Sequence, residues 1–294
     1  MKFNPQLKLA CHKELVEYLN GKKIVPINIE ISPCGICNAD CSWCFYKNQQ
    51  SHKMIETKTL IKFINESFDL GTKAITWTGG GEPTLHPDFK LLVENIKMDQ
   101  GLITNGLKIP NFNPLLFSWI RVSKTNKDWN LDALNELRKC KSVGLCINYQ
   151  GNEFEVESTL KIVYDLKLDY LQVRPALKLN GDKIKVEKPT ISDSKLLITN
   201  YKFEESFKEK KYSKCEGFHF VPFLWEDGDL DVCAYKKGNK KYNLGNIYMS
   251  SLKTIIDNFP SFVNVERDCQ TCCKNHEINS LISVLKEIQD INFV

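Results

Sequence analysis

The sequence has no long apolar run: none of its hydrophobic stretches approaches the roughly 20 residues that cross a bilayer. Its first residues, Met1-Lys2-Phe3-Asn4-Pro5, lack the apolar core of a secretory signal. These absences argue against a membrane protein and predict a cytoplasmic location, where thiols stay reduced. The 12 cysteines of this 294-residue chain are therefore not expected to form a disulfide framework.

Arginine and net charge are also scarce. The net charge is +4, and four of the 40 basic residues are arginine. Those four are Arg121, Arg138, Arg174 and Arg267. Because the charge is small, nucleic acid is not the favoured partner, and the lysine clusters at 208–214 and 236–241 are interpreted as solvated faces. A hydrophobic content of 42% is ordinary for a globular protein, and the length suffices for one barrel-sized domain with a smaller appendage.

A concentration of cysteines follows an alternating apolar run, Ile27–Ile31, that predicts a strand. Cys37, Cys41 and Cys44 have the spacing C-x3-C-x2-C, which lets one short loop present three thiolates to an iron–sulfur cube. Three cysteines for four irons leave one iron without a protein ligand. A zinc site that adds Cys34 is an alternative, but structural zinc sites usually separate their cysteine pairs by more residues. Unliganded thiols are the third interpretation.

Six strand-then-helix units follow one another in the first 175 residues. Strands are predicted over 27–31, 73–77, 101–104, 119–123, 143–148 and 169–174. Helices are predicted over 13–20, 57–69, 88–97, 131–139 and 155–166. This alternation predicts an α/β fold with a parallel sheet and right-handed crossovers. Ligands of such sheets lie at the carboxyl ends of the strands, where the unusual residues of this sequence fall.

Polar motifs follow several of these strands. Gly79–Pro83, after the second strand, combines backbone freedom with one carboxylate, so it suits either a close ligand contact or a tight turn with a solvated glutamate. Thr104-Asn105-Gly106, after the third, is a generic turn by itself. Ser123 ends the fourth strand, where its hydroxyl either contacts a ligand or faces solvent. Arg174 ends the sixth strand, where it either binds a ligand or forms an ion pair at the rim of the barrel. Arg121, Asn148 and Gln172 also lie on the predicted strands, and they are weaker candidates for ligand contacts.

The cysteine loop, with the aromatic Trp43 before its last cysteine, resembles the cluster-binding loop of the radical S-adenosylmethionine (radical SAM) enzymes. The resemblance implies a partial (β/α)6 barrel in which the amino and carboxylate groups of S-adenosylmethionine chelate the open iron of a [4Fe-4S] cluster. One electron, supplied by a reductant such as flavodoxin or ferredoxin, then cleaves the sulfonium. The products are methionine and a 5′-deoxyadenosyl radical, which abstracts hydrogen from a substrate.

The resemblance also assigns roles to the polar motifs. The turn at Gly80–Glu82 resembles the segment that binds the amino group of S-adenosylmethionine, and the Thr104-Asn105 turn resembles the loop near its ribose. Arg174 is a candidate clamp for the methionine carboxylate or for an acidic substrate group. The cofactor-binding residues implied in this way are Trp43, Gly80, Gly81, Glu82, Thr104, Asn105, Ser123 and Arg174.

A second set of cysteines lies after the sixth strand, enough to saturate a cluster or a tetrahedral zinc. Its members are Cys215, Cys233, Cys269 and Cys272, with Cys273 as an alternative to the last. Their order, with Leu244–Ile247 between them, resembles the shortened auxiliary-cluster domain, called twitch, of the SPASM/twitch radical SAM enzymes. The resemblance implies a second [4Fe-4S] cluster in a small domain of one hairpin and helices, with structural zinc as the alternative.

The expected organisation is a helical lead-in over 1–23, a barrel over 24–175, a linker and helix over 176–212, and an auxiliary domain over 213–294. A fully ligated auxiliary cluster has no iron free for substrate, so we expect it to exchange an electron with a substrate radical. That role favours net oxidation or bond formation on a small molecule or peptide. Modification of a nucleotide or nucleic acid is the second hypothesis, and a non-enzymatic, zinc-stapled binding protein is the third.

Overall fold

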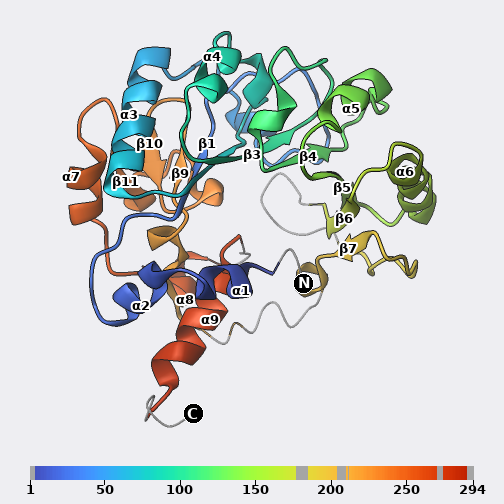
Figure 1. The fold of residues 1–294 in the computed structure, drawn as a ribbon. Helices are drawn as coiled ribbons and strands as arrows, with labels where there is room; N and C mark the ends of the chain where they lie inside the picture. The colour runs from blue at the N-terminus through green and yellow to red at the C-terminus, as the bar shows by residue number, and fades with distance from the viewer. Residues whose placement is uncertain (1–3, 177–184, 204–209, 211, 270–273, 290–294) are drawn as a thin grey trace.

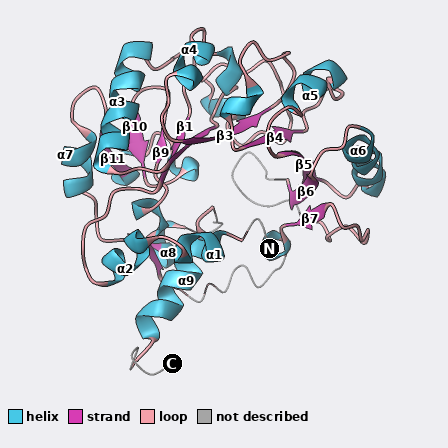
Figure 2. Ribbon diagram, viewed as in Figure 1, coloured by secondary structure: helices cyan, strands magenta, loops and turns pink. Residues whose placement is uncertain are grey.

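One ten-stranded sheet forms the centre of the molecule, and its strands lie in an arc (Figure 1; Figure 2). The computed structural model describes residues 4–176, 185–203, 210, 212–269 and 274–289. The strand order is β11-β10-β9-β1-β2-β3-β4-β5-β6-β7, and all neighbours from β9 to β7 are parallel. The strands are β1 (Asn28–Ile31), β2 (Ala74–Trp77), β3 (Asp99–Thr104), β4 (Trp119–Ser123), β5 (Val143–Tyr149), β6 (Tyr170–Pro175), β7 (Leu196–Ile198), β8 (Lys214–Cys215), β9 (Phe223–Leu224), β10 (Asp229–Asp231), β11 (Asn243–Asn246) and β12 (Val263–Asn264).

Helices cover the convex side of the arc, and a second group lies near its base (Figure 1). The helices are α1 (Pro5–Ala10), α2 (Lys13–Leu19), α3 (Thr57–Leu70), α4 (Phe89–Glu94), α5 (Leu131–Leu137), α6 (Glu153–Asp165), α7 (Leu252–Asp257), α8 (Val265–Asp268) and α9 (His276–Glu287). The apolar spacing of α3 buries Leu60, Phe63 and Ile64, and Gly71 ends that helix in the left-handed conformation that glycine adopts at low cost. Helices α1 and α2 both contact α9, which joins the two ends of the chain.

The predicted α/β fold and all six predicted strands of the barrel are confirmed. Within the predicted linker and helix over 176–212, the helix was expected from about residue 194, and this is wrong over Leu196–Ile198, where β7 pairs in parallel with β6. Leu196–Ile198 has only three apolar residues, too few for a recognisable period, so the open edge of β6 decides its conformation. Helix α1 was not predicted.

The hairpin predicted after Phe218 is confirmed, and it joins the barrel sheet. Leu230 of β10 lies opposite Leu224 of β9 in an antiparallel pair, with Gly228 at positive φ in the turn. On its other side β9 pairs in parallel with β1, where Glu30 lies opposite Phe223. The C-terminal region therefore extends the edge of the barrel sheet at β1, the strand that leads into the cysteine loop.

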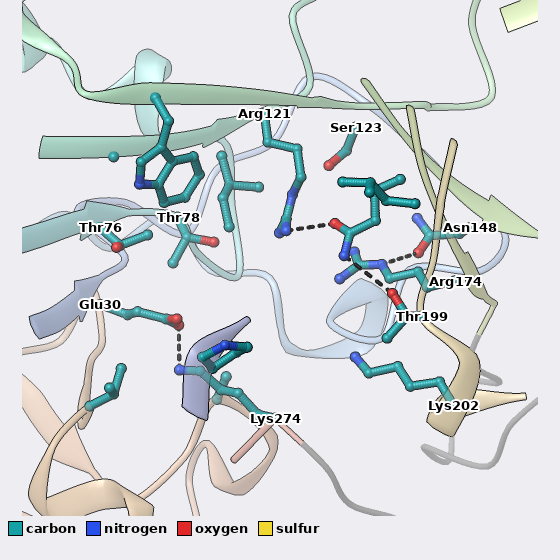
Figure 3. Close-up of a pocket in the computed structure, with 18 of the residues that line it drawn as sticks. Glu30, Thr76, Thr78, Arg121, Ser123, Asn148, Arg174, Thr199, Lys202 and Lys274 are labelled. Atoms are coloured by element: carbon teal, nitrogen blue, oxygen red, sulfur yellow. Dashed lines mark hydrogen bonds and ion pairs between the residues drawn. The ribbon is translucent and has the colours of Figure 1, made fainter. Parts of the chain in front are cut away.

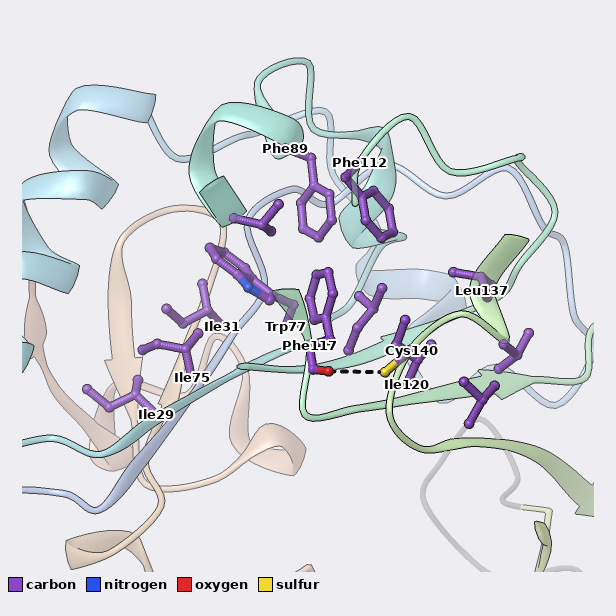
Figure 4. Packing of buried hydrophobic residues seen from close by; sticks show 14 of the residues in the cluster. Ile29, Ile31, Ile75, Trp77, Phe89, Phe112, Phe117, Ile120, Leu137 and Cys140 are labelled. Carbon is purple, nitrogen blue, oxygen red and sulfur yellow. Dashed lines mark hydrogen bonds between the residues drawn. The ribbon is translucent and has the colours of Figure 1, made fainter. Parts of the chain in front are cut away.

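The main hydrophobic core lies between the sheet and its outer helices (Figure 4). Trp77 packs edge-on against Phe89, whose ring continues in the same way to Phe112 and then Phe117. Gln100 accepts a hydrogen bond of 2.9 Å from the indole of Trp77, so this buried polar group is satisfied. Removing these apolar side chains from water, at about 25 cal/mol per Å², stabilises the outer layer on which the inner face depends.

The inner face of the arc carries small, polar and aromatic residues. A Cβ atom on Gly101 would lie 2.3 Å from the ring of Trp119, and one on Gly144 would lie 2.2 Å from the ring of Tyr170. The two glycines therefore make room for two aromatic side chains near the amino ends of β4 and β6. Above this aromatic layer, the inner face is polar toward the carboxyl ends of the strands.

The close fit of Gly144 and Tyr170 gives a test of the fold. We expect Gly144→Ala to destabilise the protein by about 1–3 kcal/mol, because the added methyl group must displace a packed ring. Scanning calorimetry would detect a lower melting temperature, and the double variant Gly144→Ala/Tyr170→Leu should recover part of the loss. If the single variant has the same melting temperature as the wild type, the packing of β5 against the ring of Tyr170 is wrong.

Candidate functional site

The three cysteines of the C-x3-C-x2-C motif lie together on the loop after β1. Cys37, Cys41 and Cys44 are all partly exposed, and they line a cavity of about 2660 Å³ that continues into the lumen of the barrel. Trp43 lines the same cavity. Burial raises the pKa of each of the three thiols. A bound metal would act in the opposite direction, because it is the thiolate that serves as ligand.

Cys34 is not part of this set, although it is the fourth cysteine of the loop. It is fully buried, and its thiol donates a hydrogen bond of 3.1 Å to the carbonyl oxygen of Glu82. Among the described residues, no three His, Cys, Asp or Glu side chains converge as they would around a single metal ion. A cube, unlike a single zinc ion, binds its thiolates at separate corners. The donor set of three thiols on one loop, facing open space, therefore fits a cluster with one open iron.

Glu82 joins the loops that follow β1, β2 and β3. Its side chain is 2% exposed, and it accepts hydrogen bonds from the Thr104 hydroxyl at 2.6 Å and the Asn105 backbone N–H at 2.7 Å. It also accepts from the backbone N–H and hydroxyl of Thr84. Its own backbone N–H donates to the carbonyl oxygen of Ile36 at 2.7 Å. Burial raises the pKa of the Glu82 carboxyl, and these donors act in the opposite direction.

The glycines before Glu82 permit close contact with the cysteine loop. A Cβ atom on Gly81 would lie 2.4 Å from the carbonyl oxygen of Ile36, so only glycine fits there. The Gly80 N–H donates to the hydroxyl of Ser32 at 3.2 Å. The predicted glycine–glutamate turn and the cysteine loop thus form one packed unit at the carboxyl ends of β1 and β2.

The predicted residues on β4 and β6 face the same cavity (Figure 3). Arg174 donates from Nε to Asn148 at 2.9 Å. Ser123 ends β4 beside them. At the opposite wall, Glu30 of β1 forms an ion pair with Lys274. The structure therefore brings together at one cavity all the predicted cofactor-binding residues except Gly80, which lies behind Gly81 against Lys237 and Trp225.

Three cysteines of the second set lie in the described part of the C-terminal region. Cys215, Cys233 and Cys269 belong to one small hydrophobic cluster. Cys233 and Cys269 also line the large cavity, and Cys215 is buried and accepts a hydrogen bond from Asn279 at 3.3 Å. The predicted fourth ligand, Cys272, and its alternative, Cys273, lie outside the described residues.

The two groups of cysteines are joined by aromatic contacts. The ring of Phe45, next to Cys44, lies edge-on to Tyr235 with 4.9 Å between ring centroids. The Tyr46 hydroxyl donates to the carbonyl oxygen of Ala234 at 3.0 Å. Because Ala234 and Tyr235 directly follow Cys233, the two cysteine segments are in direct contact.

A buried ion pair holds the same junction together. Lys237 and Glu226 are 2.5 Å apart, and their side chains are 11% and 1% exposed. Glu226 also accepts a hydrogen bond of 2.7 Å from Ser51, beyond the first cysteine loop. Sequence reasoning missed this pair, and it missed Ser32 and the Glu30–Lys274 pair. Of these contacts, the sequence indicates one partner only. Glu30 alternates with the buried isoleucines of β1, so it was expected to point to the other face of the sheet.

Comparison with known proteins identifies the class of this site. The fold and the site together are an α/β partial barrel with a three-thiol loop after its first strand. Residues 31–167, just under half of the chain, match the sequence model of the radical SAM superfamily. This region is a radical SAM domain, which makes the chain a radical SAM enzyme, and enzymes of that superfamily use a [4Fe-4S] cluster and S-adenosylmethionine. The zinc-stapled, non-enzymatic hypothesis is therefore set aside.

Solved structures show the same fold. Streptococcus suis SuiB bound to the precursor peptide SuiA superposes with a TM-score of 0.63 and 17% identity, over 88% of this chain and 71% of SuiB. The protein anSMEcpe with bound AdoMet superposes with a TM-score of 0.57 and 16% identity, over 86% of this chain and 88% of that protein. At these identities the likeness concerns the fold alone.

The chain is also similar to curated proteins with two different activities. A probable GTP 3′,8-cyclase of Methanococcus maripaludis is 30% identical over 121 residues, or 39% of this chain and 36% of the cyclase. The chain thus matches little more than a third of the cyclase's length. A cyclic dehypoxanthine futalosine synthase of Halalkalibacterium halodurans is 24% identical over 273 residues, or 87% of this chain and 67% of the synthase.

Within the described ranges, no helix is both long and apolar enough to cross a bilayer.

The bonding of Glu82 gives a test of the site. Each carboxylate oxygen accepts a backbone N–H, from Thr84 or from Asn105. We expect Glu82→Gln to destabilise the protein by about 1–3 kcal/mol, because the amide NH2 must face one of these donors in either orientation. The melting temperature of the variant measures this loss. The control Glu136→Gln removes an exposed ion pair with Lys139 and should cost less than about 1 kcal/mol. Equal melting temperatures for the two variants would contradict the role of Glu82.

Proposed function

We propose that Cys37, Cys41 and Cys44 bind a [4Fe-4S] cluster whose open iron holds S-adenosylmethionine. When bound, the cluster supplies the electron that cleaves this cofactor to methionine and a 5′-deoxyadenosyl radical, which abstracts hydrogen from a substrate. The observation that carries the proposal is the position of the three thiols on one loop, at the mouth of a cavity that continues into the lumen.

The residues around the cysteines orient S-adenosylmethionine in this proposal. Gly81 keeps the turn after β2 flush against the cysteine loop, so backbone groups of this turn are available to the amino group of the cofactor. The Glu82 carboxylate positions the Asn105 turn through its hydrogen bonds, and its Oε2, which accepts a single one, can also accept from the amino group of the cofactor. Ser123 and Arg174, at the ends of β4 and β6, are assigned to the methionine carboxylate or ribose.

The second cysteine set is proposed to hold an auxiliary [4Fe-4S] cluster of the twitch kind. Cys215, Cys233 and Cys269 supply three ligands and Cys272 the fourth. Support comes from their place in one hydrophobic cluster, and from the contact of Phe45 with Tyr235 between the two cysteine segments. An auxiliary cluster at this position would exchange an electron with a substrate radical in the cavity. The proposed reaction is therefore a net oxidation or bond formation on a small molecule or peptide.

Nucleotide modification is the second candidate function. The observation that favours it is the 30% identity to a probable GTP 3′,8-cyclase over 121 residues. The positively charged side chains of the lumen, among them Arg121, Arg174 and Lys202, are compatible with a phosphate-bearing substrate. In both cases the electron donor is proposed to be a small redox protein such as flavodoxin or ferredoxin.

The formation of 5′-deoxyadenosine tests the proposed function. The protein is reconstituted anaerobically with iron and sulfide and supplied with S-adenosylmethionine and dithionite, alone and with fractionated cell extract. We expect 5′-deoxyadenosine from the wild type and a loss of at least about 100-fold in the Cys37→Ala/Cys41→Ala/Cys44→Ala variant, because no protein ligand of the catalytic cluster remains. The control Cys11→Ala removes an exposed thiol outside the cavity and should leave the yield unchanged. Wild-type protein that holds iron but forms no 5′-deoxyadenosine would refute the proposal.

The auxiliary cluster is tested by metal content. Iron analysis of reconstituted protein should give about eight irons per wild-type chain and about four in Cys215→Ala/Cys233→Ala, if each set of cysteines holds a four-iron cluster. We expect this variant to keep cleaving S-adenosylmethionine. It should no longer form the substrate-derived product with the extract fraction that stimulates 5′-deoxyadenosine formation in the wild type. About four irons plus one zinc in the wild type would favour the structural zinc site instead. Unchanged product formation in the folded variant would contradict the electron-exchange role.

A further inference from the structure

Arg121 lies in the lumen of the barrel and is held by a neutral side chain. Its Nη1 donates to Oε1 of Gln172 on β6 at 2.9 Å (Figure 3). The strand between them, β5, has Gly144 opposite Arg121 and Cys146 opposite Gln172. Gln172 is fixed in turn by donating from Nε2 to the Thr199 hydroxyl at 3.2 Å. Three elements therefore set the orientation of one guanidinium group.

The charge of Arg121 has no acidic partner among the described residues. The lumen carboxylate of Glu30 is paired with Lys274, and the buried carboxylate of Glu226 is paired with Lys237. No ion pair between Arg121 and a described carboxylate is formed. Its Nε is buried and has no hydrogen-bond partner. The rest of the side chain is half-buried and lines the cavity, so an anion bound there would supply the missing partner for its charge.

The geometry of the guanidinium suits an oxyanion. Gln172 takes one donor of Nη1, and the buried Nε has no surface that a ligand could reach, so the remaining donors of the two Nη groups are those available to a ligand. A guanidinium presents these donors in a planar fork that suits a carboxylate or a phosphate. Arg174 and Lys202 line the same cavity and add positive charge around it.

The depth of Arg121 separates it from the place assigned to S-adenosylmethionine. Arg121 precedes Ser123 by two residues on β4. At about 3.3 Å per residue, it lies roughly 7 Å farther from the carboxyl end of the strand, where the cysteine loop is. An anion on Arg121 would therefore lie beneath the cofactor, on the side of the lumen where a substrate has room.

We propose that Arg121, oriented by Gln172 and Thr199, binds a carboxylate or phosphate group of the substrate inside the barrel. The inference rests on the proposed function and narrows its substrate to an anionic molecule. The anionic group anchors the substrate below the cofactor and so fixes which of its C–H bonds faces the mouth of the cavity.

The test measures binding of simple anions to the reconstituted enzyme under anaerobic conditions, with S-adenosylmethionine at saturation. Inorganic pyrophosphate and citrate are the phosphate and carboxylate probes, and thermal-shift titration gives their affinities. We expect at least one probe to bind the wild type and to bind Arg121→Gln about 10-fold or more weakly, because a charge-assisted contact is lost. Arg121→Lys should retain part of the affinity, and the control Arg138→Gln, which changes an exposed arginine on α5's C-terminal side, should match the wild type.

A second readout separates the substrate from the cofactor. The affinity for S-adenosylmethionine, measured by calorimetry, should be the same in Arg121→Gln and the wild type. A 10-fold loss of that affinity would overturn the proposal, because Arg121 would then hold the cofactor's carboxylate. Equal probe binding by Arg121→Gln and wild type, or no probe binding to either, would overturn it as well. Each of these results leaves 5′-deoxyadenosine formation by the wild type unaffected, so the failure of this inference is distinguishable from failure of the proposed function.

Discussion

The buried carboxylate of Glu82 is the interaction on which the site depends. Its two oxygens accept hydrogen bonds from Thr84, Thr104 and Asn105, and its backbone N–H bonds to Ile36 in the cysteine loop. A charge so deeply placed is stable only because several donors converge on it. The loops after three neighbouring strands therefore share one anchor. Without it, neither the glycine turn nor the Asn105 turn would have a fixed position relative to the three cysteines.

The lumen differs between its two ends. The rings of Trp119 and Tyr170, admitted by Gly101 and Gly144, lie at the amino-terminal side of the strands. The carboxyl-terminal side keeps polar groups around free space, and the hairpin of β9 and β10 brings the second cysteine segment to its rim. A molecule in the lumen would thus be in reach of both groups of cysteines. This arrangement accounts for the buried Glu226–Lys237 pair, which fixes the hairpin against the first cysteine loop.

Much of the fold was predictable because β1 to β6 carry local signals. Ile29 and Ile31 alternate with Asn28 and Glu30, and this alternation identifies the strand and its inward face without knowledge of its neighbours. β7 could not be predicted in this way, because Leu196–Ile198 is a strand only through its pairing with β6. The cysteine motif of the site was recognisable from spacing alone.

The remaining parts of the site depend on contacts between residues far apart in the sequence. Glu226 and Ser51 are 175 positions apart, and Arg121 and Gln172 are 51 apart. No local pattern indicates such pairs. The hydrogen bonds that Glu82 accepts from Thr104 and Asn105 also join separate loops, and no local pattern indicates them. Its predicted contact with the cofactor stays a prediction beside this structural role.

The central claim is that the loop after β1 holds a cluster with an open iron that binds S-adenosylmethionine. Electron paramagnetic resonance of the dithionite-reduced Cys215→Ala/Cys233→Ala variant, which isolates this cluster, tests it directly. The account predicts a [4Fe-4S] signal whose g values change when S-adenosylmethionine is added and which is absent when Cys37, Cys41 and Cys44 are also replaced. A signal that does not respond to S-adenosylmethionine, or that survives the loss of these three cysteines, would contradict the account.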